Sequence, residues 1–177
     1  KVHSKPIPRI GGVAIFLSSM ALLIPVLFLP NIIWDSFRFI QSKIVALLIV
    51  AGFMFLVGLA DDIRGLPARI KLVSQLIAAS IVCFMGIRID SITITDSLVL
   101  GLGPFSWSLT ILWIVGITNA VNFIDGLDGL AAGICVATCG VIIILPLFFG
   151  PALKTVMMLS ILGALTGFLF FNFNPAN

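Results

Sequence analysis

The sequence predicts an all-α polytopic membrane protein, with about six transmembrane helices and one short extracytoplasmic β-hairpin. Hydrophobic residues make up 60% of the chain and charged residues only 10%, whereas roughly a quarter of the residues in soluble domains are charged. Apolar stretches, each close to the ~20 residues that cross a bilayer as a helix, lie at 12–29, 44–60, 72–87, 105–123, 130–149 and 155–171. None of the charged residues falls inside them. Because backbone groups in lipid must be hydrogen-bonded internally, these stretches are expected to be helical.

The charge pattern argues against nucleic-acid binding and against a histidine-rich metal centre. The net charge of +3 is small and scattered along the chain, whereas nucleic-acid-binding domains gather basic residues on one face. His3 is the only histidine. Because the chain opens on Lys1 and stops soon after its last apolar stretch, we expect it to be part of a longer protein.

The first residues, 1–11, are basic and broken by prolines. They form either a positive anchor that sets the orientation of the first span or an arm that faces a phosphate. The basic side chains available to such an arm are Lys1, His3, Lys5 and Arg9. After the first span, the mixture of aromatic and charged residues at 31–42 predicts a short interfacial helix.

Two adjacent carboxylates, Asp61 and Asp62, follow the second apolar stretch. Such a pair is costly at a membrane edge unless a cation or hydrogen bonds compensate it. Arg64 and Arg69 are the cations expected to do so if the pair is purely structural, and an ordinary acidic loop is the other alternative.

The third span begins near Ile70 and carries Lys71 and Gln75 one turn apart on one face. Residues 88–104, which follow it, are too polar to span a membrane. Within them, 92–95 alternates like a strand and 98–100 returns, which predicts a short hairpin.

Side chains with oxygen acceptors recur at every third position from the end of the fourth span to the start of the fifth, at Asn119, Asn122, Asp125 and Asp128. On a helix or a tight helical turn, neighbours three residues apart share one face. Such oxygen ligands suit a hard cation such as Mg²⁺ and also hydrogen-bond a polar ligand. The alternative is two Asp-Gly turns, with Asp128 capping a helix that begins at Gly129.

Counting spans places the polar segments on one side of the membrane. Two crossings separate Asp61 from Asp125, two more lead to Asn172, and the basic arm lies two spans before Asp61. That side carries six basic residues against four on the other, which indicates the cytoplasm. Mg²⁺ typically binds through one or two carboxylates plus substrate phosphates, so these residues predict a site for a metal-bound polyanion.

Taken together, these segments resemble the polyprenyl-phosphate N-acetylhexosamine-1-phosphate transferases, in glycosyl transferase family 4. The matching pieces, in the family's order, are the arm with His3, Pro6 and Gly11-Gly12, then 61–66 with Lys71, Leu72 and Gln75, then 119–133, and finally 167–172 with Pro175 and Ala176. Family members continue into a further aspartate motif and a histidine-containing loop. The arm lacks the Thr-Pro-Thr pattern expected before the glycine pair in the phospho-N-acetylmuramoyl-pentapeptide branch of the family, which favours the N-acetylglucosamine or a related branch.

The resemblance implies an enzyme that transfers N-acetylhexosamine-1-phosphate, with GlcNAc favoured, from a UDP-N-acetylhexosamine to undecaprenyl phosphate and releases UMP. It implies Mg²⁺ as the cofactor, with Mn²⁺ as the alternative ion. Residues 1–177 would form one transmembrane catalytic domain of the cell membrane, its site facing the cytoplasm. The product would initiate a cell-envelope glycan, and a homodimer is one possible assembly.

The resemblance also implies roles for individual residues. Asp61, Asp62, Asp125 and Asp128 would be the catalytic carboxylates, and of these Asp61 and Asp62 would be metal ligands. Asn119, Asn122 and Asn172 would hold the nucleotide, and His3 and Lys5 would meet phosphate.

A transporter for cations or solutes is the rival hypothesis, because it could use the same acidic residues. It requires ionisable groups near the bilayer midplane. Here every charge lies outside the apolar stretches, which favours the enzyme.

Overall fold

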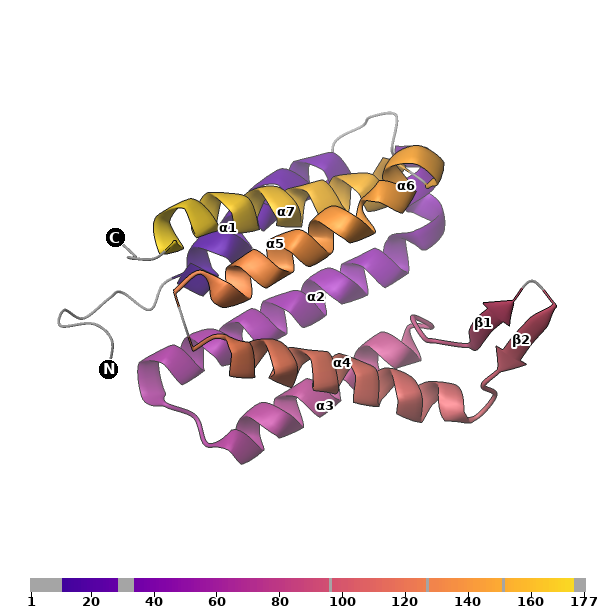
Figure 1. Cartoon of the computed structure of the whole chain (residues 1–177), viewed down its shortest axis with the longest axis horizontal. Coiled ribbons are helices and arrows are strands. Elements are labelled where there is room, and N and C mark those ends of the chain that lie inside the picture. Colours follow the sequence, from indigo (N-terminus) through magenta and orange to yellow (C-terminus); the bar gives the residue numbers. More distant parts are fainter. Residues whose placement is uncertain (1–10, 29–33, 96, 127, 151, 174–177) are drawn as a thin grey trace. The chain divides into compact units, whose positions relative to one another are not determined.

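The computed structural model describes residues 11–28, 34–95, 97–126, 128–150 and 152–173. Its helices are α1 (Gly11–Phe28), α2 (Trp34–Arg64), α3 (Ala68–Phe84), α4 (Phe105–Ile124), α5 (Leu130–Ile142), α6 (Ile144–Phe149) and α7 (Ala152–Asn172) (Figure 1). Strands β1 (Ser91–Thr95) and β2 (Leu98–Gly101) lie between α3 and α4. The described residues fall into two compact units, one within Gln41–Asn122 and the other within Lys1–Ile40 and Phe123–Asn177.

Most of these helices suit a membrane. Among the described residues, four segments are long and apolar enough to cross one: Ser42–Arg64, Phe105–Ile124, Leu130–Phe149 and Ala152–Asn172. The helix over Gly11–Leu27 is apolar but shorter. Large apolar side chains on the helices are exposed, with Leu112 at 69% and Phe123 at 87%, as expected where lipid surrounds them. The predicted class, an all-α membrane protein with a small hairpin, is confirmed.

Two helix boundaries differ from the prediction. The sequence predicts a separate interfacial helix at 31–42, but α2 runs without a break from Trp34 to Arg64; residues 31–33 lie outside the described part of the chain. No glycine or proline occurs between Trp34 and Ala51, so nothing in the local sequence ends the helix before the span. The span predicted at 130–149 is interrupted at Ile143, which separates α5 from α6.

In the unit Gln41–Asn122, α2, α3 and α4 share an apolar core. Its buried members are Val50, Ala78 and Val82, and Leu47, Met54, Ile87 and Ile114 pack against them. The end of α2, the start of α3 and the end of α4 lie at the same end of this unit (Figure 1). Polar side chains at that end of the three helices therefore share one neighbourhood.

The hairpin lies at the opposite end of the same unit. Strands β1 and β2 pair antiparallel, with Thr93 opposite Val99, and all their residues are exposed. At its base, the Oγ of Ser106 donates to Asp90 Oδ1 at 2.9 Å. These contacts fix the hairpin to the first turn of α4.

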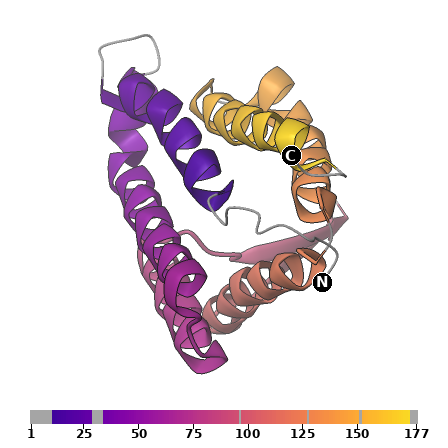
Figure 2. The ribbon, with the colours of Figure 1, turned by 90° about the vertical axis from the view of Figure 1, so that its left-hand side faces the viewer.

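In the other unit, α7 contacts α1, α5 and α6 (Figure 2). The Oγ of Ser160 donates to the backbone oxygen of Ser19 at 2.9 Å, and both serines are buried. Such hydrogen bonds commonly link helices inside membranes. Gly11 lies against Phe168, because a Cβ at Gly11 would come within 2.5 Å of the ring.

Candidate active site

The turn between α2 and α3 positions Asp61. Gly65 adopts the left-handed conformation, with φ +66°, and its N–H donates to the Asp61 backbone oxygen at 2.8 Å. This is how a glycine commonly ends a helix. Pro67, extended at φ −63° and ψ 145°, then precedes the first turn of α3. Asp61 therefore lies one turn before the connection, and Lys71 lies one turn after it.

Both side-chain oxygens of Asp61 accept hydrogen bonds. The N–H of Leu66 donates to Oδ1 at 2.8 Å, and the Nζ of Lys71 donates to Oδ2 at 3.0 Å. A carboxylate near the C-terminal end of a helix faces the negative end of the helix dipole, and these donors offset that repulsion. For a purely structural carboxylate pair, the sequence predicts Arg64 and Arg69 as the compensating cations; the structure brings Lys71 to Asp61.

Asp62 is exposed and occupies a different position around α2. Adjacent residues on an α-helix are separated by about 100°, so Asp62 does not share the Lys71-facing side of α2 with Asp61. The two neighbouring carboxylates thus have different surroundings, one held between donors and one open.

A second hydrogen bond joins α3 to α4. The Nδ2 of Asn119 donates to Gln75 Oε1 at 2.6 Å and to the backbone oxygen of Val115 at 2.8 Å. Gln75 and Asn119 are both half-buried. Gln75 lies one turn after Lys71 on α3. Successive turns of α3 therefore contact Asp61 of α2 and Asn119 of α4. The sequence places Lys71 and Gln75 on one face but gives no partner for Gln75.

The motif at 119–128 does not form one continuous helical face. Asn119 and the exposed Asn122 belong to α4, which ends at Ile124. Asp125 and Asp128 lie in the turn that follows, the first exposed and the second half-buried. The spacing of three residues predicts a shared face, but that face can extend only to the end of α4.

The start of α5 rests against the end of α7. Gly129, with φ +73°, is the N-cap residue of α5 and the structure records no side-chain cap hydrogen bond there, so the N-cap position lies one residue after Asp128. A Cβ at Gly129 would lie 3.1 Å from the backbone oxygen of Asn172 and 3.3 Å from the Leu169 side chain. The glycine therefore lets the turn that carries Asp128 approach Asn172.

Carboxylate oxygens such as those of Asp61 and Asp62 are ligands that suit Mg²⁺ or Mn²⁺. Among the described residues, no three histidine, cysteine or carboxylate side chains form a metal-binding group. Mg²⁺ needs only one or two protein carboxylates, because waters and phosphates complete its coordination. A carboxylate oxygen has two lone pairs, so it can accept a hydrogen bond and also bind an ion. The predicted phosphate contacts His3 and Lys5 lie outside the described residues.

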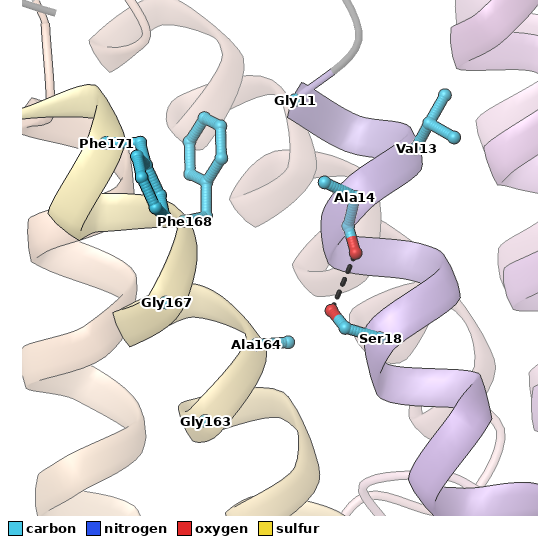
Figure 3. Close-up of a pocket in the computed structure, with 9 residues that line it drawn as sticks. All are labelled: Gly11, Val13, Ala14, Ser18, Gly163, Ala164, Gly167, Phe168 and Phe171. Atoms are coloured by element: carbon cyan, nitrogen blue, oxygen red, sulfur yellow. Dashed lines mark hydrogen bonds between the residues drawn. The ribbon is translucent and has the colours of Figure 1, made fainter. Parts of the chain in front are cut away.

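An apolar pocket of about 660 Å³ lies between α1 and α7 (Figure 3). It is lined by Gly11, Val13, Ala14, Ser18, Gly163, Ala164, Gly167, Phe168 and Phe171. The Oγ of Ser18 donates to the backbone oxygen of Ala14 at 2.6 Å, which satisfies its one hydroxyl hydrogen. The lining is thus suited to apolar groups.

The fold and these polar clusters define a multi-pass helical membrane protein with carboxylates and amides gathered at helix ends. The chain belongs to glycosyl transferase family 4, whose family model matches residues 44–177. No solved structure matches the chain.

Several curated relatives are similar to nearly the whole chain. It is 36% identical over 179 residues to the probable undecaprenyl-phosphate N-acetylglucosaminyl 1-phosphate transferase of Bacillus subtilis, covering 99% of this chain and 47% of that protein. It is 35% identical over 193 residues to a decaprenyl-phosphate N-acetylglucosaminephosphotransferase of Mycobacterium tuberculosis, covering 99% and 46%. A phospho-N-acetylmuramoyl-pentapeptide-transferase of Halalkalibacterium halodurans is 33% identical over 190 residues, covering 99% and 56%.

The chain therefore spans about half the length of these relatives. Their names describe transferases, which gives no support to the transporter alternative.

Proposed function

We propose that this protein transfers N-acetylglucosamine-1-phosphate, or a related N-acetylhexosamine-1-phosphate, from a UDP-sugar to undecaprenyl phosphate and releases UMP. The observation that carries the proposal is the cluster at one end of α2, α3 and α4. There Asp61 is held by Lys71 and the Leu66 N–H, and Asn119 is held by Gln75. The names of the relatives support the same reaction class.

In the proposed reaction, an oxygen of the lipid phosphate attacks the β-phosphorus of the UDP-sugar. The bond from that phosphorus to the oxygen bridging it to UMP breaks, and UMP leaves. The attacking oxygen is already anionic near neutral pH, so no strong general base is needed. Catalysis then depends on position and on neutralising charge as the phosphoryl group moves.

Asp61 and Asp62 would hold Mg²⁺, or Mn²⁺, against the diphosphate. When bound, the ion would neutralise charge on the diphosphate oxygens and on the leaving UMP. The Nζ of Lys71 holds Oδ2 of Asp61 at 3.0 Å and places a positive charge beside that carboxylate. Asp62, exposed next to it, would complete the carboxylate set.

The amide and acidic residues farther along the chain would hold the nucleotide. Their members in this proposal are Asn119, Asn122, Asp125, Asp128 and Asn172. His3 and Lys5 would contact phosphate. The excess of basic residues on the motif side supports a site that faces the cytoplasm, where a UDP-sugar arrives from water and the lipid phosphate from the bilayer.

The test is UMP release by the whole gene product from UDP-N-acetylglucosamine, with and without undecaprenyl phosphate and Mg²⁺. We expect release only when both are present, with Mn²⁺ able to replace Mg²⁺. Silence with every UDP-hexosamine, together with ion flux in proteoliposomes that lack UDP-sugar, would contradict the proposal and favour the transporter.

A further inference from the structure

We propose that Gln75 is a positioning residue that orients the Asn119 amide, so that Asn119 Oδ1 is presented to the UDP-sugar. This inference rests on the proposed function and deepens it. It gives Gln75, which in this proposal does not itself contact the substrate, a role in the binding of the UDP-sugar. Asn119 Nδ2 donates to Gln75 Oε1 at 2.6 Å and to the Val115 backbone oxygen at 2.8 Å.

The orientation of the Asn119 amide follows from its two neighbours. A backbone oxygen can only accept a hydrogen bond, so the atom of Asn119 that faces Val115 must be Nδ2. The second hydrogen of Nδ2 is then directed to Gln75. With both hydrogens used, Oδ1 on the other branch of the amide is the atom left to accept a hydrogen bond from a ligand.

Gln75 is the contact that can fix this direction. Val115 lies one turn before Asn119 on the same helix, so their hydrogen bond moves with α4. Gln75 belongs to α3 and therefore defines the amide relative to a second helix. Removing the Gln75 acceptor would leave the Asn119 side chain one partner and more rotational freedom.

The surroundings of Gln75 suit a fixed support. On α3, the neighbouring residues Ser74, Ala78 and Ala79 are buried, and Lys71 one turn earlier is tied to Asp61. A hydrogen bond in such a packed, partly buried place is electrostatically stronger than one in water. The same face of α3 thus holds the carboxylate of α2 and the amide of α4.

The test compares Gln75→Leu, Gln75→Glu, Asn119→Ala and the double variant Gln75→Leu/Asn119→Ala in the whole protein. The KM values for UDP-N-acetylglucosamine and for undecaprenyl phosphate are measured separately. We expect Gln75→Leu to raise the KM for the UDP-sugar about tenfold, the size of one lost hydrogen bond, and to leave the KM for the lipid unchanged.

Two further results are expected. The double variant should be no worse than Asn119→Ala alone, because residues that act through one another are not additive. Gln75→Glu keeps an acceptor oxygen and should hold the KM for the UDP-sugar to within about threefold of the wild-type value. Ser80→Ala is the matched control, since the Ser80 hydroxyl donates to the backbone oxygen of Leu76 in its own helix, α3.

An unchanged KM for the UDP-sugar in Gln75→Leu, or equal changes in both KM values, would overturn the inference while leaving the proposed function standing. Additive effects of Gln75→Leu and Asn119→Ala would also overturn it. A wild-type protein that releases no UMP would overturn the proposed function and this inference together. The wild-type assay therefore separates the two failures.

Discussion

At the scale of single residues, Asp61 and Asp90 of the unit Gln41–Asn122 both accept hydrogen bonds from side chains but differ in how exposed they are. Asp61 lies between Lys71 and a backbone N–H at the end of α2, and its side chain is only 27% exposed. Asp90, at the base of the hairpin, accepts from Ser106 and its side chain is 65% exposed. Asp90 stabilises a local turn, whereas Asp61 is held in place and, in the proposed function, would be a carboxylate ligand of the metal ion.

We expect Asp61→Asn to lower UMP release by at least about a hundredfold, the size commonly seen when one electrostatic contact to a reacting group is lost. The amide keeps the shape of the side chain but not its charge. Asp90→Asn is the matched control and should retain activity within about twofold, since surface changes away from a site have small effects. Wild-type turnover in Asp61→Asn would remove Asp61 from the mechanism.

Lys71 gives a second prediction at this scale. Lys71→Gln removes the cation from Asp61, and we expect turnover to fall roughly tenfold to a hundredfold, because hydrogen bonds to charged groups contribute about 1.5–3 kcal/mol. Lys43→Gln is the control, since within the described residues the Lys43 Nζ donates to the Gly86 backbone oxygen at 3.4 Å, in the hairpin half of the unit. Equal losses in both variants would show that any lysine on these helices matters as much as Lys71.

At the scale of elements, the connection between α4 and α5 shows what sequence patterns can and cannot predict. The spacing of three residues identifies the polar positions but predicts one helical face, which α4 supports only as far as Ile124. Gly126 and Gly129 explain the break, because glycine costs about 1 kcal/mol inside a helix. The left-handed Gly129 directly precedes α5, and its role depends on α7, a partner distant in sequence.

Replacing Gly129 tests this element. In Gly129→Ala, the alanine would have to adopt a positive φ, which costs an L-residue about 1–2 kcal/mol. Its Cβ would also lie 3.1 Å from the Asn172 backbone oxygen. We expect a lower Tm in detergent than for the wild-type protein. Gly126→Ala is the control, because a Cβ there meets nothing within 4 Å and its φ is not positive. A Tm equal to that of the control would contradict the close approach of α5 and α7.

At the scale of the whole molecule, hydropathy predicted the fold class because lipid requires long apolar helices, whereas the alternation of residues at 92–95 predicted the hairpin. Hydropathy did not predict which helices touch, because a helix that is apolar all round shows no preferred face. The hydrogen bond between Gln75 and Asn119 therefore could not be predicted from the sequence. The ion pair between Lys71 and Asp61 could have been predicted, since both residues lie one turn from the glycine-proline connection between α2 and α3.

Membrane topology gives a prediction at this scale. With Cys83, Cys135 and Cys139 replaced, Thr93→Cys in the hairpin should react with a membrane-impermeant maleimide in intact cells. Arg64→Cys, exposed beside the Asp61 turn, should react only after the membrane is opened. We expect this pattern because the basic residues favour a cytoplasmic location for that turn. Labelling of Arg64→Cys in intact cells would contradict the proposed orientation and place that turn outside the cytoplasm.

The most direct test of the proposed reaction follows the β-phosphorus of the donor. The whole protein would be given UDP-N-acetylglucosamine labelled on its β-phosphate and, in a parallel reaction, on its sugar, together with undecaprenyl phosphate and Mg²⁺. We expect both labels to enter the lipid in equal amounts while unlabelled UMP is released. Transfer of the sugar label alone, with the β-phosphorus left in UDP, would contradict phosphosugar transfer and indicate attack at the sugar carbon instead.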